Sequence, residues 1–98
     1  MSKQSKACDI SKKVKDEVWE RDEHKCIICG SYQAMPNAHY IARSHGGLGI
    51  PQNIVTLCFF CHFNYDHSPV RKEYKNIIQA YLKSKYDVWN EQDLIYRK

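Results

Sequence analysis

Four cysteines fall into two C-x-x-C pairs that can hold one metal ion. Cys26 and Cys29 form the first pair, and Cys58 and Cys61 form the second. Two thiolates on one tight turn reach a tetrahedral ion together, and two such turns supply four sulfur ligands at about 2.3 Å. Gly30 suits the first turn because glycine tolerates positive φ. The spacing is typical of structural zinc, although the spacer is longer than in a short zinc ribbon.

Two disulfides in a secreted protein are the alternative explanation of these pairs. Residues 1–6 are polar and contain no apolar signal-peptide core. Five cysteines also leave an odd one, Cys8, which fits a reducing compartment better. We therefore expect a zinc site that contributes on the order of 10 kcal/mol or more to folding, with Cys8 as a spectator thiol.

Length and charge set broad limits on function. The chain of 98 residues is expected to form one small domain, in which a metal supplements a modest core. The formal net charge is +4, which permits a polyanionic partner without requiring one. No apolar run approaches the roughly 20 residues that span a bilayer, so we expect no membrane partner.

The elements that position these residues follow from the apolar pattern. Residues 1–10 are predicted to form a flexible polar arm. Ser11 is a plausible N-cap for a helix that ends near residue 22, with Val14 and Val18 on its apolar face. The turn that follows leads into the first cysteine pair and leaves His24 exposed.

A β-hairpin is predicted between the two cysteine pairs. Residues 38–41 alternate as strands do, and residues 53–57, with Ile54, Val55 and Leu57, can return as a second strand after a glycine-containing loop. A short helix is predicted to begin near Cys61. His62 and Asp66 lie four residues apart and would share one face of that helix.

The remainder of the chain is predicted to be a helical extension, residues 68–98, packed on a domain of residues 11–67. Its helix over residues 70–83 has one apolar face, and the aromatic tail over residues 86–98 is expected to dock on the core or on a partner. The predicted fold class is therefore α+β, a zinc-stapled hairpin-and-helix domain with flanking N- and C-terminal helices.

The centre of the chain contains a set of spaced polar residues. It reads His39-Tyr40-Ile41-Ala42-Arg43-Ser44-His45-Gly46-Gly47, followed by Asn53 and by Cys58-Phe59-Phe60-Cys61-His62. This arrangement, with the lead-in Trp19-Glu20-Arg21-Asp22, resembles the HNH endonuclease family, whose fold is the ββα-metal (His-Me finger) motif. The resemblance covers residues 11–66, and many members of that family carry the same two C-x-x-C pairs.

The resemblance implies metal-dependent hydrolysis of DNA phosphodiester bonds, by nicking or by double-strand cleavage. His39 would be the general base, Asn53 would orient that base or contact the metal region, and His62 would bind a catalytic divalent ion such as Mg²⁺. Histidine suits the base because its ordinary pKa lies near neutrality. Asp66 is a candidate for a further ligand of that ion. Such proteins are expected in the cytoplasm of a bacterium or a phage-infected host, alongside DNA packaging or restriction partners.

The resemblance also implies nucleic-acid contacts near the loop between the strands. Arg43 can hold a phosphate through its planar guanidinium group, and His45 is the second candidate for nucleic-acid binding. Simpler explanations stand beside these roles. Arg43 can be an exposed basic residue, Asn53 can cap a turn, and His62 can support the neighbouring zinc ligand from outside.

One departure from the family pattern concerns the residue before the predicted base. Most members carry Asp or His there as a ligand of the catalytic metal, whereas this chain has Ala38. Either His62, Asp66 and water hold the ion, or His45 substitutes, or metal affinity and catalysis are reduced. The spacing of His62 and Asp66 favours the first alternative.

Two other classes of function compete with the nuclease. Ala38 favours a non-catalytic zinc module that binds nucleic acid, and the aromatic tail favours a protein-interaction module. Cleavage specificity and oligomeric state have no signal in the sequence.

Overall fold

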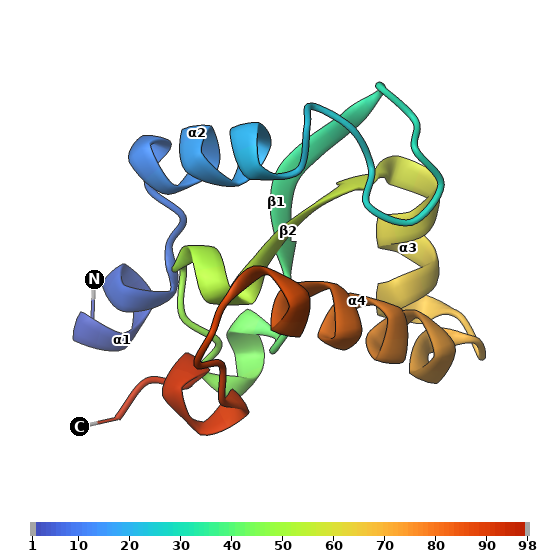
Figure 1. Ribbon diagram of the computed structural model, residues 1–98. Helices are drawn as coiled ribbons and strands as arrows, with labels where there is room; N and C mark the ends of the chain where they lie inside the picture. Colours follow the sequence, from blue (N-terminus) through green and yellow to red (C-terminus); the bar gives the residue numbers. More distant parts are fainter. Residues whose placement is uncertain (1, 98) are drawn as a thin grey trace.

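A computed structural model describes residues 2–97 as helices arranged around one antiparallel hairpin. Helices α2 and α4 lie on opposite sides of the hairpin (Figure 1). This arrangement confirms the mixed α+β class. The elements are α1 (Lys3–Cys8), α2 (Lys12–Arg21), β1 (Ala34–His39), η1 (Arg43–His45), η2 (Pro51–Asn53), β2 (Ile54–Cys58), α3 (Phe59–His67), α4 (Arg71–Lys85) and η3 (Glu91–Leu94).

Helix α2 begins where its N-cap predicts. The hydroxyl group of Ser11 accepts a hydrogen bond from the backbone N–H of Val14 at 3.2 Å, which satisfies one of the free donors of the first turn. Val18 is fully buried, and Val14 is half-buried. The predicted helix over residues 11–22 is therefore confirmed, and it turns one apolar edge toward the hairpin.

The hairpin is irregular at one point. Met35 pairs with Leu57 and Ala38 pairs with Val55, so β1 has one residue more than β2 between these pairs. Pro36 lies in this bulge, where its missing N–H breaks no ladder hydrogen bond. The hairpin prediction is confirmed, but β1 spans Ala34–His39 rather than the predicted residues 38–41.

Strand β2 is buried along its whole length. Val55 and Leu57 belong to a core cluster that includes Ile78 and Leu82 of α4. Successive residues of a strand point to opposite faces, so the alternate residues of β2 face α2. Burial on both faces explains why its sequence is almost entirely apolar.

The N-terminal residues differ from the prediction of an arm over residues 1–10. Helix α1 occupies Lys3–Cys8 and docks on the loop between the strands. The backbone N–H of Gly49 donates to the carbonyl of Ala7 at 3.0 Å. A Cβ atom on Gly49 would lie 2.0 Å from the carbonyl oxygen of Asp9, so only glycine permits this approach. A helix this short is marginal alone, and tertiary contacts stabilise it.

The C-terminal segment closes the other side of the loop. Leu94 is buried in the core cluster, and the indole N–H of Trp89 donates to the carbonyl of Gln52 at 2.8 Å. Gly47 forms an isolated antiparallel bridge with Ile95. Within residues 2–97, no helix has both the length and the apolar character needed to cross a membrane.

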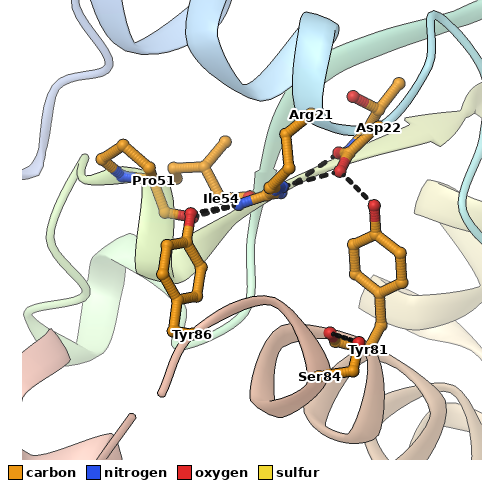
Figure 2. Close-up of polar contacts among 8 residues, drawn as sticks. Arg21, Asp22, Pro51, Ile54, Tyr81, Ser84 and Tyr86 are labelled. Atoms are coloured by element: carbon orange, nitrogen blue, oxygen red, sulfur yellow. Dashed lines mark hydrogen bonds and ion pairs between the residues drawn. The ribbon is translucent and has the colours of Figure 1, made fainter. Parts of the chain in front are cut away.

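A buried ion pair connects the helices to the hairpin. The guanidinium group of Arg21 binds the carboxylate of Asp22 through two donors, at 2.7 and 3.1 Å. Its remaining donors reach the carbonyls of Pro51 and Ile54 and the hydroxyl of Tyr86 (Figure 2). All five N–H groups of this arginine are therefore bonded. Burial opposes the charge of Arg21, but the hydrogen bonds and charge of Asp22 outweigh burial and raise its pKa.

The carboxylate of Asp22 is equally well satisfied. It is 3% exposed and also accepts hydrogen bonds from the backbone N–H of Thr56 at 2.8 Å and from the hydroxyl of Tyr81 at 2.5 Å. Burial, followed by the hydrogen bond to Asp22, raises the pKa of Tyr81, which keeps the phenol protonated as the donor. Helix α2, strand β2 and helix α4 thus meet at one carboxylate.

Replacement of Tyr81 by phenylalanine tests this connection. We expect Tyr81→Phe to lower the free energy of unfolding by about 1–3 kcal/mol, because a buried acceptor loses one of its partners. Urea unfolding at fixed metal concentration measures the change. Tyr32→Phe is the matched control, since Tyr32 is 78% exposed and the same change there should stay within about 0.5 kcal/mol. Equal effects of the two changes would contradict the assignment.

Candidate functional site

The four predicted cysteines meet at one point. The Sγ atoms of Cys26, Cys29, Cys58 and Cys61 all lie within 4.8 Å of one another. Tetrahedral zinc with Zn–S bonds of about 2.3 Å separates its sulfur ligands by about 3.8 Å, and Cys29 and Cys58 lie 3.5 Å apart. The cluster is therefore positioned to bind a metal ion such as zinc.

Each C-x-x-C pair is held by its own local structure. Gly30 has a φ of +79°, and its N–H donates to the carbonyl of Cys26 at 3.0 Å, which closes the first turn. The N–H of Ile27 donates to the carbonyl of Thr56 at 3.0 Å, which fixes this turn to β2. The second pair spans the start of α3, where Cys58 is the N-cap.

The pKa values of the thiols in the cluster are shifted in opposite directions. Burial opposes ionisation of Cys26, but hydrogen bonds from the backbone of Cys29, Cys58 and Ile28 lower its pKa to about 7. Burial and a hydrogen bond to Cys58 raise the pKa of Cys61 well above its usual value. A bound cation would hold such thiols as thiolates, which is the form in which the four cysteines could bind a metal. Cys8 is not among the four metal-binding cysteines.

His39 ends strand β1 and is held by the N-terminal helix. Its Nε2 lies 2.9 Å from the carbonyl oxygen of Cys8, the last residue of α1. A carbonyl oxygen only accepts, so Nε2 carries the proton and Nδ1 presents its lone pair. The neutral imidazole can therefore accept a proton at Nδ1.

The surroundings of His39 favour that neutral form. Burial lowers its pKa below the usual value, and the positive charges of Arg43 and His62 lower it further. The hydrogen bond to Cys8 and the charge of Asp9 oppose this shift without reversing it. At neutral pH the imidazole is thus mainly in its neutral form, with one proton on Nε2.

His62 and Asp66 lie together on helix α3, as their spacing predicts. Nε2 of His62 is 3.3 Å from a carboxylate oxygen of Asp66, and the two side chains are 31% and 47% exposed. Both line a pocket of about 170 Å³. Their nitrogen and oxygen donors can face one divalent ion and leave its other positions open.

The alternative in which His45 supplies the missing ligand receives less support. Ala38 is fully buried in the core cluster, next to the predicted base. His45 is exposed and lines a different pocket from that of His62 and Asp66. The geometry therefore brings Asp66, and not His45, to His62.

Asn53 is completely buried and bonds to the backbone of the loop. Its Oδ1 accepts from the N–H of Ile41 at 2.8 Å, and its Nδ2 donates to the carbonyls of Ile41 and Leu48 at 3.2 and 2.9 Å. Its carbonyl accepts from the N–H of Tyr40 at 2.7 Å. This geometry supports a positioning role, in which Asn53 fixes the chain directly after His39.

Arg43 is engaged within the protein, and its contact with phosphate stays a prediction. Its guanidinium group forms an ion pair with Asp9, and it donates to the carbonyl of Ser5 at 3.1 Å. The reason is the docked helix α1, which the sequence pattern did not reveal. Arg43 thereby attaches the segment that carries the hydrogen-bond partner of His39.

Sequence reasoning missed three groups near His39 and His45. The backbone carbonyl of Cys8 could not be found from the sequence, since every residue type has a backbone carbonyl. Arg71 and Lys75 have a weak signal, a basic i, i+4 pair at the start of a predicted helix. They line one pocket with His45.

A small mixed α+β fold with a four-cysteine metal centre defines the class of this protein. Among curated proteins, the chain is 33% identical over 55 residues to anaredoxin from Nostoc sp., a stretch that covers 55% of this chain and 72% of anaredoxin. The chain belongs to the same family as anaredoxin. No protein-family model matches it, and neither does a solved structure.

Metal analysis of cysteine variants tests the centre. We expect one bound metal per chain in the wild type and in Cys8→Ala, and a loss of metal in Cys58→Ser, because three thiolates hold zinc less tightly than four. Elemental analysis gives the stoichiometry. A strong chelator should also lower the melting temperature of the wild type, since a structural metal contributes on the order of 10 kcal/mol to folding. Unchanged metal content in Cys58→Ser would contradict the site.

Proposed function

We propose that this protein is a metal-dependent endonuclease that hydrolyses DNA phosphodiester bonds with a ββα-metal site of the HNH type. The observation that carries the proposal is His39 at the end of β1, held by the carbonyl of Cys8 with its Nδ1 able to accept a proton. The sequence resemblance assigns this residue as the base, and the hydrogen bond supplies the tautomer that a base requires.

The metal-binding part of the proposal rests on helix α3. His62 and Asp66 fit a divalent ion such as Mg²⁺, since one imidazole nitrogen and one carboxylate oxygen lie 3.3 Å apart on an accessible face. When bound, such an ion neutralises charge on a phosphate and on the leaving oxygen. His62 is also close enough to influence the pKa of His39, which supports a single centre.

The roles of the protein side chains follow from these contacts. His39 takes a proton from the attacking water at Nδ1. The resulting imidazolium keeps its hydrogen bond to the carbonyl of Cys8, which stabilises the added charge. Asn53 holds the backbone that follows His39, and the four cysteines would hold a structural metal that connects the start of α3 to the first cysteine pair.

Electron transfer at the four-cysteine centre is a second candidate function. Four thiolates in a tetrahedron bind iron as well as zinc, and the related protein is named anaredoxin. Cys29 is exposed, so a redox partner has access to one ligand. Iron in the elemental analysis, with a visible absorption that bleaches on reduction, would favour this function. Colourless protein with one zinc per chain would exclude it.

A supercoiled-plasmid nicking assay tests the endonuclease. We expect nicking by the wild type with Mg²⁺, Mn²⁺ or Ni²⁺ and none in EDTA. His39→Ala should reduce the rate by about 10²–10⁴-fold, which is the contribution of a general base. His24→Ala is the matched control, because His24 is an exposed histidine outside this centre and its loss should leave the rate unchanged.

The zinc content of each variant must equal that of the wild type for this comparison. Equal nicking by His39→Ala would contradict the assignment of the base. If the wild type binds DNA but does not cut it with any of these ions, the result would support the non-catalytic zinc module. If it does not bind DNA, the result would support the interaction module.

The metal dependence of nicking tests the second ligand. We expect Asp66→Ala to raise the Mg²⁺ concentration for half-maximal nicking by about tenfold or more, since even partners that only orient metal ligands contribute 10–100-fold. Asp16→Ala on the exposed face of α2 is the control for loss of one carboxylate. An unchanged Mg²⁺ titration in Asp66→Ala would exclude this pairing.

A further inference from the structure

A basic pocket lies between helix α4 and the loop after β1. It has a volume of about 320 Å³, and its polar lining includes His45, Arg71 and Lys75 but no acidic residue. Arg71 and Lys75 are four residues apart on α4, so their side chains share one face. Arg71 and Lys75 lie beyond residues 11–66, which resemble the HNH family, whereas His45 lies within them.

The two cationic side chains each lie over the ring of a buried tyrosine. The guanidinium carbon of Arg71 lies 5.1 Å from the centroid of the Tyr65 ring, and the ammonium nitrogen of Lys75 lies 5.7 Å from that of Tyr40. Both rings are almost fully buried, and the hydroxyl of Tyr65 donates to the carbonyl of Tyr40 at 2.5 Å. Cation–π contact with a fixed ring restricts a flexible side chain, so the two charges are positioned in advance.

These charges have no ion-pair or side-chain hydrogen-bond partner among the described residues. Among residues 2–97, neither Arg71 nor Lys75 forms an ion pair or a side-chain hydrogen bond, whereas Arg21 and Arg43 both bind carboxylates. Two fixed donor groups around a polar pocket favour an oxyanion ligand, and guanidinium groups suit phosphate in particular.

The position of the pocket indicates where the phosphate comes from. Tyr40 follows His39 directly, and Tyr65 precedes Asp66 directly, so the two buried rings link the pocket to the proposed cleavage centre. Arg43, the phosphate contact expected from the sequence, is already engaged by Asp9.

We infer that Arg71 and Lys75, together with His45, bind a backbone phosphate of nucleic acid beside the cleavage centre. The inference rests on the proposed function for the identity of the ligand. The contact carries no base information, so it would position the strand without specifying its sequence.

Binding of fluorescein-labelled DNA tests the inference without cleavage. Single-stranded and duplex oligonucleotides are titrated by fluorescence anisotropy at several salt concentrations, in buffer without added divalent ion and with metal-loaded protein. The variant carries Arg71→Gln and Lys75→Gln, which keep side chains over the tyrosine rings. We expect its affinity to fall about tenfold and its salt slope to decrease by about 1, as for the loss of one phosphate contact.

The matched control carries Lys72→Gln and Lys83→Gln on the same helix, with the same change in net charge. Both lysines are exposed and lie outside the pocket, so the control should weaken binding by less than about threefold. Equal weakening by the two variants, no weakening by the first, or no binding by the wild type would overturn the inference. Circular dichroism and zinc content establish that each variant is folded.

The nicking assay on the same proteins separates this inference from the proposed function. Wild-type binding that depends on Arg71 and Lys75, without any nicking, would support the phosphate site and reject the nuclease. If the wild type nicks DNA and the glutamine variant binds DNA with unchanged affinity, the results would support the nuclease and reject the phosphate site.

Discussion

The Arg21–Asp22 ion pair is the interaction on which the arrangement of the helices depends. It lies where α2 ends, and it binds the backbone of η2 and β2 together with two tyrosines of the C-terminal third (Figure 2). A buried charge pair is weak evidence for stability by itself, because desolvation offsets much of the attraction. Here every donor of the guanidinium group has a partner, so the pair specifies geometry: each segment must occupy one place to satisfy it.

The loop between the strands is fixed in a comparable way by backbone contacts. Asn53 bonds to two points of this loop, and Gly47 lies so close to Ile41 that a Cβ atom would be 1.7 Å from its carbonyl oxygen. Helix α1 and the residues around Ile95 then pack against the same loop from different directions. The result is that His39 lies at the end of a strand whose following residues cannot move independently.

Two kinds of site share the hairpin and helix α3. The four cysteines offer soft sulfur ligands, and His62 with Asp66 offers harder donor atoms on an accessible face. Cys61 and His62 are neighbours in sequence, so a metal bound at the cysteines would fix the backbone that carries His62, a proposed ligand of the second ion. Folding and any chemistry at α3 are coupled through this single helical turn.

Much of this organisation is determined by local sequence. The C-x-x-C spacing predicts the metal cluster, the Ser11 cap and apolar periodicity predict α2, and the i, i+4 spacing brings His62 to Asp66, because each of these signals acts over a few residues. The roles of Arg43 and of residues 1–10 were not predictable in this way. Helix α1 has no apolar stripe. It is held by partners more than thirty residues away, because Asp9 pairs with Arg43 and the carbonyl of Ala7 accepts from Gly49.

The tertiary structure alone decided three features of the site. It placed the carbonyl of Cys8 against His39 and so selected the proton-accepting nitrogen, turned Asn53 toward the loop backbone, and assembled Arg71 and Lys75 over buried tyrosine rings. Each of these depends on contacts between segments distant in the chain. The sequence determined which chemical groups are available, and the tertiary packing decided which of them are engaged within the protein and which remain accessible to a ligand.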